Sequence, residues 1–210
     1  MRVWGMLWVV VVSAAVLPHA AIADEQPARL LASLPSHLRT QTASIPPTAP
    51  SLVDQLARRY TSPDAVAGFL RDAFTFTRDE DLFGEVDYWQ SPEEFAARRV
   101  GDCEDYALLA QALLRRNGVE AYVVSLFGED GYAHTVSVFI DEQGRHNVIN
   151  QGAIRYYRAA SLEALASAVY PGWTFGGIAE REGTRGRFVR ELINPAPAPD
   201  AAWGDFNHTL

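Results

Sequence analysis

Apolar residues recur at helical spacing in two neighbouring runs of the chain, 51–60 and 62–76. In the first run, Leu52, Leu56 and Tyr60 fall on one helical stripe behind a serine that can cap the helix. The second run begins with Ser-Pro, which suits the cap and the first helical position, and continues with apolar residues at the same spacing. The pattern predicts two helices that pack against each other.

Two further helices are predicted on either side of Gly101. The run SPEEFAARR, residues 91–99, carries the serine, proline and glutamate that mark the start of a short helix. An apolar helical pattern then extends from Cys103 to about Asn117, and Gly118 ends it because glycine adopts the left-handed conformation without strain. This longer helix begins at the only cysteine in the chain.

β-branched and aromatic residues dominate three later runs, VEAYVVSLF, AHTVSVFI and RHNVINQ. Glycine-containing turns separate these runs at 128–131 and 141–144, so we expect an antiparallel meander. A last helix is predicted around 161–170, where Pro-Gly follows it. The predicted fold class is α+β, with the cysteine-bearing helix packed on an antiparallel sheet.

The two ends of the chain differ in composition from the predicted domain at 51–193. Residues 1–23 combine an arginine, a short apolar run and an Ala-x-Ala site, which are typical of a secretory signal peptide. An uncleaved membrane anchor is the alternative, although the apolar run is short for a membrane span. Residues 24–50 are predicted to be a loosely ordered lead-in and residues 194–210 a disordered Pro/Ala-rich tail. We therefore expect an exported protein, periplasmic or extracellular, without stable membrane insertion after signal cleavage.

The overall composition is that of a globular protein, because 48% of the 210 residues are hydrophobic and 21% are charged. The formal net charge is −8, every basic residue is arginine, and no basic run occurs. Without a basic patch the protein lacks the electrostatic attraction that phosphate backbones require, so nucleic acid is excluded as an expected partner. Nothing in the sequence sets the oligomeric state.

A single cysteine cannot form an internal disulfide, although disulfides are the usual use of cysteine in exported proteins. Cys103 is therefore a buried inert thiol, an intermolecular link or a nucleophile. Its place at a helix N-terminus after Asp102 favours a thiolate, because unpaired N–H groups and the helix dipole stabilise negative charge there. The charges of Glu104 and Asp105 oppose that effect, so the sequence leaves the direction of the thiol pKa shift open.

His134 and His146 are the only histidines in the predicted domain. His134 opens a strand and shares its inward face with apolar residues at alternate positions, which suits a base that faces a neighbour. If the second and third strands pair as a hairpin, the residues opposite His134 lie near 150–153, where Asn150 and Gln151 are the polar side chains. An amide oxygen there could accept the imidazole N–H, and the other ring nitrogen would then face the thiol.

The run YWQSPEEFAARRVGDCEDYALLAQALLRRNGVEAYVV, followed by AHTVSVFI and NVINQG, resembles the transglutaminase-like superfamily, particularly the bacterial transglutaminase-like cysteine proteinases. The resemblance implies a papain-like core in which a cysteine at a helix N-terminus faces a histidine and an aspartate on neighbouring strands. It implies Cys103 as the nucleophile, His134 as the base and Asn150 at the place where the family usually has aspartate. That asparagine is papain-like, but it supports an imidazolium less than a carboxylate does.

The same resemblance adds candidate metal and substrate contacts. Some adhesin-cleaving periplasmic relatives bind Ca²⁺ through carboxylates flanking the cysteine, which here would be Asp102 and Glu104. The alternative is that Asp102 only caps the helix and Glu104 is solvated, and no other cofactor is required. Trp89 and Gln151 are the candidate substrate contacts, with packing under the cysteine-bearing helix as the alternative role for Trp89.

The function predicted from these residues is that of a cysteine peptidase or amidase that acts on a protein or peptide through a thioacyl intermediate. Transfer of the acyl group to an amine instead of water would make it a transglutaminase. Two alternatives lie in other classes: a catalytically silent module that binds a protein or a cell-wall peptide, and a structural domain whose cysteine is buried.

Overall fold

The computed structural model describes residues 49–128 and 131–194, all within the second of two compact units, 49–210. The predictions for the signal peptide at 1–23, for most of the lead-in at 24–50 and for nearly all of the tail fall outside the described residues. Among the described helices, none is long and apolar enough to cross a membrane.

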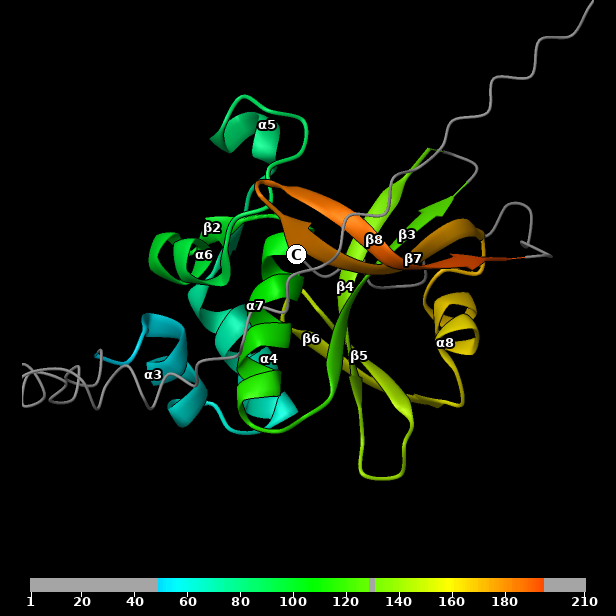
Figure 1. Cartoon of the computed structure of the whole chain (residues 1–210), viewed down its shortest axis with the longest axis horizontal. Coiled ribbons are helices and arrows are strands. Elements are labelled where there is room, and N and C mark those ends of the chain that lie inside the picture. The colour runs from blue at the N-terminus through cyan, green and yellow to red at the C-terminus, as the bar shows by residue number, and fades with distance from the viewer. Residues whose placement is uncertain (1–48, 129–130, 195–210) are drawn as a thin grey trace, which may run out of the picture. The chain divides into compact units, whose positions relative to one another are not determined.

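A six-stranded sheet organises the described residues (Figure 1). Its strand order is β6-β5-β4-β3-β7-β8, and every neighbouring pair is antiparallel. The predicted meander corresponds to three consecutive neighbours, β3, β4 and β5. The strands are β3 Ala121–Gly128, β4 Ala133–Ile140, β5 His146–Asn150, β6 Ala153–Ala159, β7 Trp173–Glu182 and β8 Arg185–Ile193.

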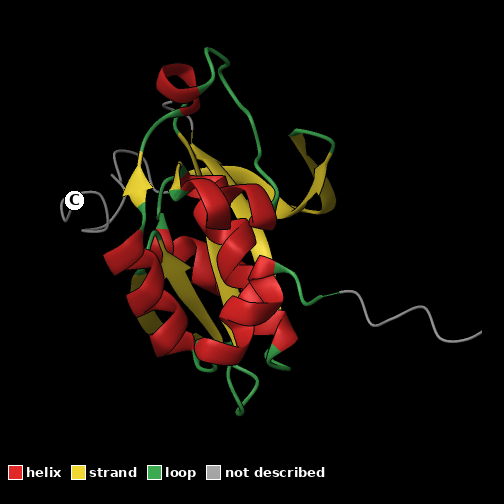
Figure 2. Ribbon diagram, turned by 90° about the vertical axis from the view of Figure 1, so that its left-hand side faces the viewer, coloured by secondary structure: helices red, strands yellow, loops and turns green. Residues whose placement is uncertain are grey.

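Helices cover both faces of this sheet, which confirms the predicted α+β class (Figures 1 and 2). Buried residues of α3, α4, α6 and α7 form one apolar cluster with Phe139 and Ile149. Buried residues of α8 form another with Val138 and Val148. Because successive residues of a strand point to opposite faces, α7 and α8 lie on opposite faces of the sheet. The remaining elements are α3 Leu52–Arg59, α4 Pro63–Ala73, α5 Asp79–Leu82, α6 Pro92–Arg98, α7 Cys103–Arg116, α8 Leu162–Val169 and the parallel pair β1 Thr75–Phe76 and β2 Val100–Gly101.

The helix starts follow the cap residues of the sequence. The Ser62 hydroxyl accepts the Ala65 N–H at 3.2 Å at the start of α4. At the start of α6, the Ser91 hydroxyl accepts the Glu94 N–H at 3.2 Å, and the Glu94 carboxylate accepts the Ser91 N–H at 2.7 Å. Gly118 follows α7 at φ 76°, the left-handed conformation expected of it. Local capping chemistry therefore sets these boundaries.

The buried face of α3 differs from the predicted stripe. Leu52 is 39% exposed, whereas Val53 and Ala57 are buried, and Leu56 and Tyr60 are half-buried. The prediction was therefore wrong for Leu52. The neighbouring helices α6 and α7 select the face of α3 that is buried, and a short stretch with several apolar positions does not encode that choice.

Strands β7 and β8 were not predicted, although they extend the sheet past β3. Two consecutive glycines, Gly176 and Gly177, weaken the strand pattern of β7, and four of the nine residues of β8 are charged without strict alternation. A Cβ on Gly176 would lie 2.4 Å from the carbonyl oxygen of Ser125, and one on Gly177 would lie 2.1 Å from that of Arg190. The glycines therefore permit the close approach of β7 to both neighbours, and this hairpin forms one wall of the site described next.

Candidate active site

The N-terminus of α7 holds the thiol in place. Cys103 is the first residue of the helix, and Asp102 is its N-cap. Asp105, in the first turn, accepts the Asp102 N–H at 3.3 Å and also accepts the backbone N–H and side-chain amide of Gln90, at 2.8 and 2.5 Å. A Cβ on Gly101 would lie 2.1 Å from the Asp105 carboxylate. The Asp105 carboxylate thus ties the segment before α6 to the start of α7.

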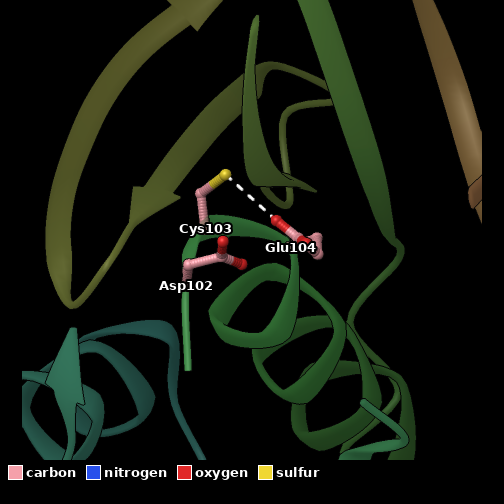
Figure 3. Close-up of side chains that lie close together, drawn as sticks. All are labelled: Asp102, Cys103 and Glu104. Carbon is pink, nitrogen blue, oxygen red and sulfur yellow. Dashed lines mark hydrogen bonds between the residues drawn. The ribbon is translucent and has the colours of Figure 1, made fainter. Parts of the chain in front are cut away.

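The Cys103 thiol donates a hydrogen bond to Glu104 Oε2 at 3.2 Å (Figure 3). Burial raises the pKa of the thiol well above its ordinary value, and the charges of Glu104 and Asp102 raise it further. The backbone N–H of Thr135 counteracts these effects, because its hydrogen bond to the sulfur lowers the pKa. Burial, together with the flanking carboxylates, therefore outweighs the effects that favour the thiolate, and this group is a neutral thiol at neutral pH.

The two other predicted members of the triad contact each other. His134 Nε2 lies 2.9 Å from Asn150 Oδ1, and the two side chains are 3% and 4% exposed. Burial lowers the pKa of His134 to about 4, although the hydrogen bond to Asn150 opposes that shift. The imidazole is therefore neutral at neutral pH, and the bond to Asn150 engages its Nε2. Thr135, whose N–H is bonded to the thiol, directly follows His134.

A cavity of about 420 Å³ opens beside Cys103. Trp89 lines it, as do Ser125 and Thr135, whose hydroxyls are 2.8 Å apart. Neither His134 nor Asn150 is among its lining residues, and Gln151 lies instead in the turn after β5, at φ 48°. Of the two predicted substrate contacts, the structure therefore brings only Trp89 to the thiol. The full lining is Val86, Asp87, Trp89, Asp102, Cys103, Glu104, Ser125, Phe127, Ala133, Thr135, Ala179, Gly186, Arg187 and Phe188.

An acidic cluster surrounds the start of α7 and includes two carboxylates that the sequence did not assign to the site, Asp79 and Asp87. Ligand atoms of Asp79, Asp87 and Glu104 lie within 4.8 Å of one another, as do those of Asp79, Asp102 and Asp105. Burial raises the pKa of Asp79 to about 6 and that of Glu104 to about 10. Asp79 and Asp87 belong to a polar, acidic stretch of the chain, residues 77–87, but the spacing of these residues does not show that the stretch folds over α7.

Two oxygen atoms of this cluster suit a cation. Asp79 Oδ1 and Asp102 Oδ1 are buried and have no hydrogen-bond partner among the described residues. Buried carboxylate oxygens without a partner are costly, and hard oxygen ligands grouped in this way suit Ca²⁺. The donor set therefore fits the ion that the resemblance suggests.

The fold and the site define a class of protein: an α+β domain with a papain-like core and a cysteine at the N-terminus of a helix that packs on an antiparallel sheet. Residues 47–163 match the family model of the transglutaminase-like superfamily, and the chain belongs to this superfamily. A UPF0252 protein of Archaeoglobus fulgidus is 31% identical over 74 residues, which are 35% of this chain and 24% of that protein. The match therefore spans about a quarter of the relative's length.

Some solved structures are also similar to this chain. Calcium-bound LapG of Legionella pneumophila is 19% identical, with a TM-score of 0.43, over 77% of this chain and 89% of that one. A Cytophaga hutchinsonii protein whose proposed activity is that of a cysteine protease is 14% identical, with a TM-score of 0.39, over 59% of this chain and 45% of the other.

The raised pKa of Glu104 predicts a stability that depends on pH. Its folded pKa of about 10 lies above the ordinary 4.5, so the folded state keeps a proton that the unfolded state has lost. The free energy of unfolding should therefore fall as pH rises, by about 2–3 kcal/mol between about pH 6.5 and about pH 8.5. Urea unfolding in EDTA would measure it. His134, with a lowered pKa, acts in the opposite direction only below about pH 6.5.

The matched variant for this measurement is Glu104→Gln, which keeps the shape of the protonated acid but cannot ionise. We expect this variant to lose most of the fall; a remainder of under about 1 kcal/mol comes from Asp105, because burial raises the pKa of that carboxyl to about 7. An equally steep fall in both proteins would show that Glu104 is not the group responsible.

Proposed function

We propose that the protein is an exported thiol enzyme, a cysteine peptidase or amidase, in which Cys103, His134 and Asn150 act together. The observation that carries this proposal is the 2.9 Å hydrogen bond between His134 Nε2 and Asn150 Oδ1. It holds the imidazole in one orientation, and the next residue along the chain, Thr135, donates its N–H to the thiol. Export is proposed from the signal-peptide pattern of residues 1–23.

The reaction would begin from a neutral thiol and a neutral imidazole. As the Cys103 sulfur attacks the carbonyl carbon of a peptide bond, His134 Nδ1 takes the thiol proton, and Asn150 steadies the imidazolium through Nε2–H. The backbone N–H of Cys103, at the helix N-terminus, would stabilise the oxyanion. His134 then returns the proton to the leaving amine, and a thioester remains on the sulfur. Attack of water on this thioester, with His134 again as the base, releases the acid and restores the thiol.

We also propose a Ca²⁺ site at the acidic cluster, formed by Asp79, Asp87, Asp102 and Glu104. The unpartnered oxygens of Asp79 and Asp102 support this assignment. When bound, the cation would supply positive charge that offsets these carboxylates. The residues of the chain position the thiol. The Asp105 carboxylate fixes the start of α7 by accepting from Gln90, and the backbone N–H of Thr135 donates to the sulfur.

The proposal is tested by the rate at which iodoacetamide alkylates Cys103 on the full-length protein, measured against pH by intact mass. In EDTA we expect slow alkylation with a midpoint above about 8.5, the ordinary thiol pKa, because the carboxylates disfavour the thiolate. In Ca²⁺ the midpoint should move down. Replacing His134 with Ala should slow alkylation at neutral pH by about 10²-fold, the lower end of the usual effect of a general base.

His146→Ala is the matched control, because that half-buried histidine lies at the start of β5 and bonds to Ala159 O. It should leave the alkylation rate unchanged. Slow alkylation under every condition, indifferent to His134→Ala, would overturn the catalytic proposal and leave a silent binding module or a structural domain. Fast alkylation together with transfer of the acyl group to an added amine would point to the transglutaminase alternative.

A further inference from the structure

Three phenylalanine rings gather where β3, β7 and β8 meet, beside the cavity that holds the thiol. The centroids of Phe127 and Phe188 are 6.0 Å apart, and Phe175 contacts both, at 5.9 and 5.2 Å. Phe127 is 36% exposed. Phe127 and Phe188 line the cavity together with Cys103, whereas Phe175 does not. An accessible aromatic surface beside a nucleophile is typical of a binding subsite.

From this arrangement we infer that the cavity is a specificity subsite for a large apolar side chain of an extended peptide, held next to the bond that Cys103 attacks. The inference rests on the proposed function and names the substrate class of the same site. Burial of such a side chain against Phe127, Phe188, Trp89 and Ala179 removes apolar surface of both partners from water.

The floor of the subsite is held in place before any substrate arrives. Trp89 Nε1 donates to Asp87 Oδ1 at 2.9 Å, and the Trp89 carbonyl accepts from Arg181 Nε at 2.7 Å. A Cβ on Gly186 would lie 2.3 Å from the Trp89 ring, so glycine is what lets β8 pack directly over the indole. Because these contacts fix the ring, binding an apolar side chain costs little ordering of the wall, which favours selectivity.

The polar and charged surroundings of the cavity also bear on which side chains the subsite accepts. An ionised carboxylate would lose its hydration against the apolar wall of Phe127, Phe188 and Ala179, which costs free energy unless a cation pairs with it. Arg187 is the basic residue of the lining, and it already lies 3.2 Å from Glu182 and 3.9 Å from Glu180. The subsite therefore selects large apolar side chains over small ones and disfavours acidic ones.

The test uses short peptides that end in a vinyl sulfone, a group that captures thiols, and that differ only in the adjacent residue: Phe, Leu, Ala or Glu. The second-order rate of labelling at Cys103 is measured by intact mass in Ca²⁺ and divided by the iodoacetamide rate of the same protein. We expect the Phe and Leu reagents to react at least about tenfold faster than the Ala reagent, and the Glu reagent to be the slowest.

Phe188→Ala and Phe127→Ala should each reduce the preference for Phe over Ala by several-fold. Phe175→Ala is the matched control, because it removes a ring of the same cluster that does not line the cavity, and it should keep the preference. Equal rates for all four peptides, or the fastest rate with Glu, would overturn the subsite while leaving a reactive, His134-dependent thiol and the proposed function intact. If iodoacetamide also fails to alkylate Cys103 on the folded protein, the proposed function is wrong, and the proposed subsite is wrong as well.

Discussion

Replacement of Cys103 by Ala or Ser is expected to abolish peptide cleavage, with a loss of at least about 10³-fold in rate, because no other residue in the described cavity offers a comparable nucleophile. The hydroxyls of Ser125 and Thr135 also line the cavity, but they hydrogen-bond to each other at 2.8 Å rather than to a general base. The measurement is digestion of a proteome-derived peptide mixture by the full-length protein, with mass spectrometry of the new chain ends.

The same digestion separates hydrolysis from acyl transfer. In water enriched in the heavy oxygen isotope, hydrolysis of a thioester adds one heavy oxygen to each new carboxyl terminus, whereas transfer to an added biotinylated amine leaves a biotin amide. Cys103→Ser changes a single atom and should unfold at nearly the same temperature as the wild type. Cleavage by the Ser variant at the wild-type rate would remove the thiol from the mechanism altogether.

The sequence was most informative where chemistry is local. The caps at Ser62 and Ser91 and the end of α7 at Gly118 depend on residues a few positions apart, so they could be read directly. The site prediction for His134 used the strand pattern, strand pairing placed Asn150 or Gln151 opposite it, and the family resemblance pointed to Asn150. The observed register pairs Ser137 with Ile149, and its continuation would set Asn150 opposite Val136, two residues from His134 on the same face. Diagonal neighbours of this kind are within side-chain reach.

The parts that could not be predicted depend on long-range packing. The hairpin of β7 and β8 contains glycines and charged residues, which weaken a strand prediction. That it forms a wall of the site follows only from its contacts with β3 and Trp89. The same holds for Asp79, whose carboxylate accepts the Tyr88 N–H and reaches the start of α7. The direction of the thiol pKa shift also needed the structure, because the helix N-terminus and the neighbouring carboxylates act in opposite directions.

Calcium is expected to raise the unfolding temperature of the full-length protein substantially. A cation that binds only the folded state at 100 times its dissociation constant adds about 2.7 kcal/mol, which for a chain of this size corresponds to roughly 5–10 °C. The reason is specific to the cluster: the pKa of Asp79 is raised to about 6 and that of Glu104 to about 10, mainly by burial, so the folded state holds carboxyl groups that ionise only at a cost. A bound cation would remove that cost.

Differential scanning fluorimetry in EDTA, Mg²⁺ and Ca²⁺ would measure the shift, with calorimetry for the stoichiometry. Mg²⁺ should act more weakly, because it gives up its water shell reluctantly. The double variant Asp79→Asn, Asp102→Asn should lose the calcium response and yet be more stable than the wild type in EDTA at pH 8, since two mutually repelling buried acids are gone. Asp81→Asn is the matched control, because this exposed aspartate lies on the same short helix as Asp79 and should respond to calcium like the wild type. A full calcium response in the double variant would show that any bound ion lies elsewhere. If the double variant is instead less stable than the wild type in EDTA, the two carboxylates stabilise the fold without a cation.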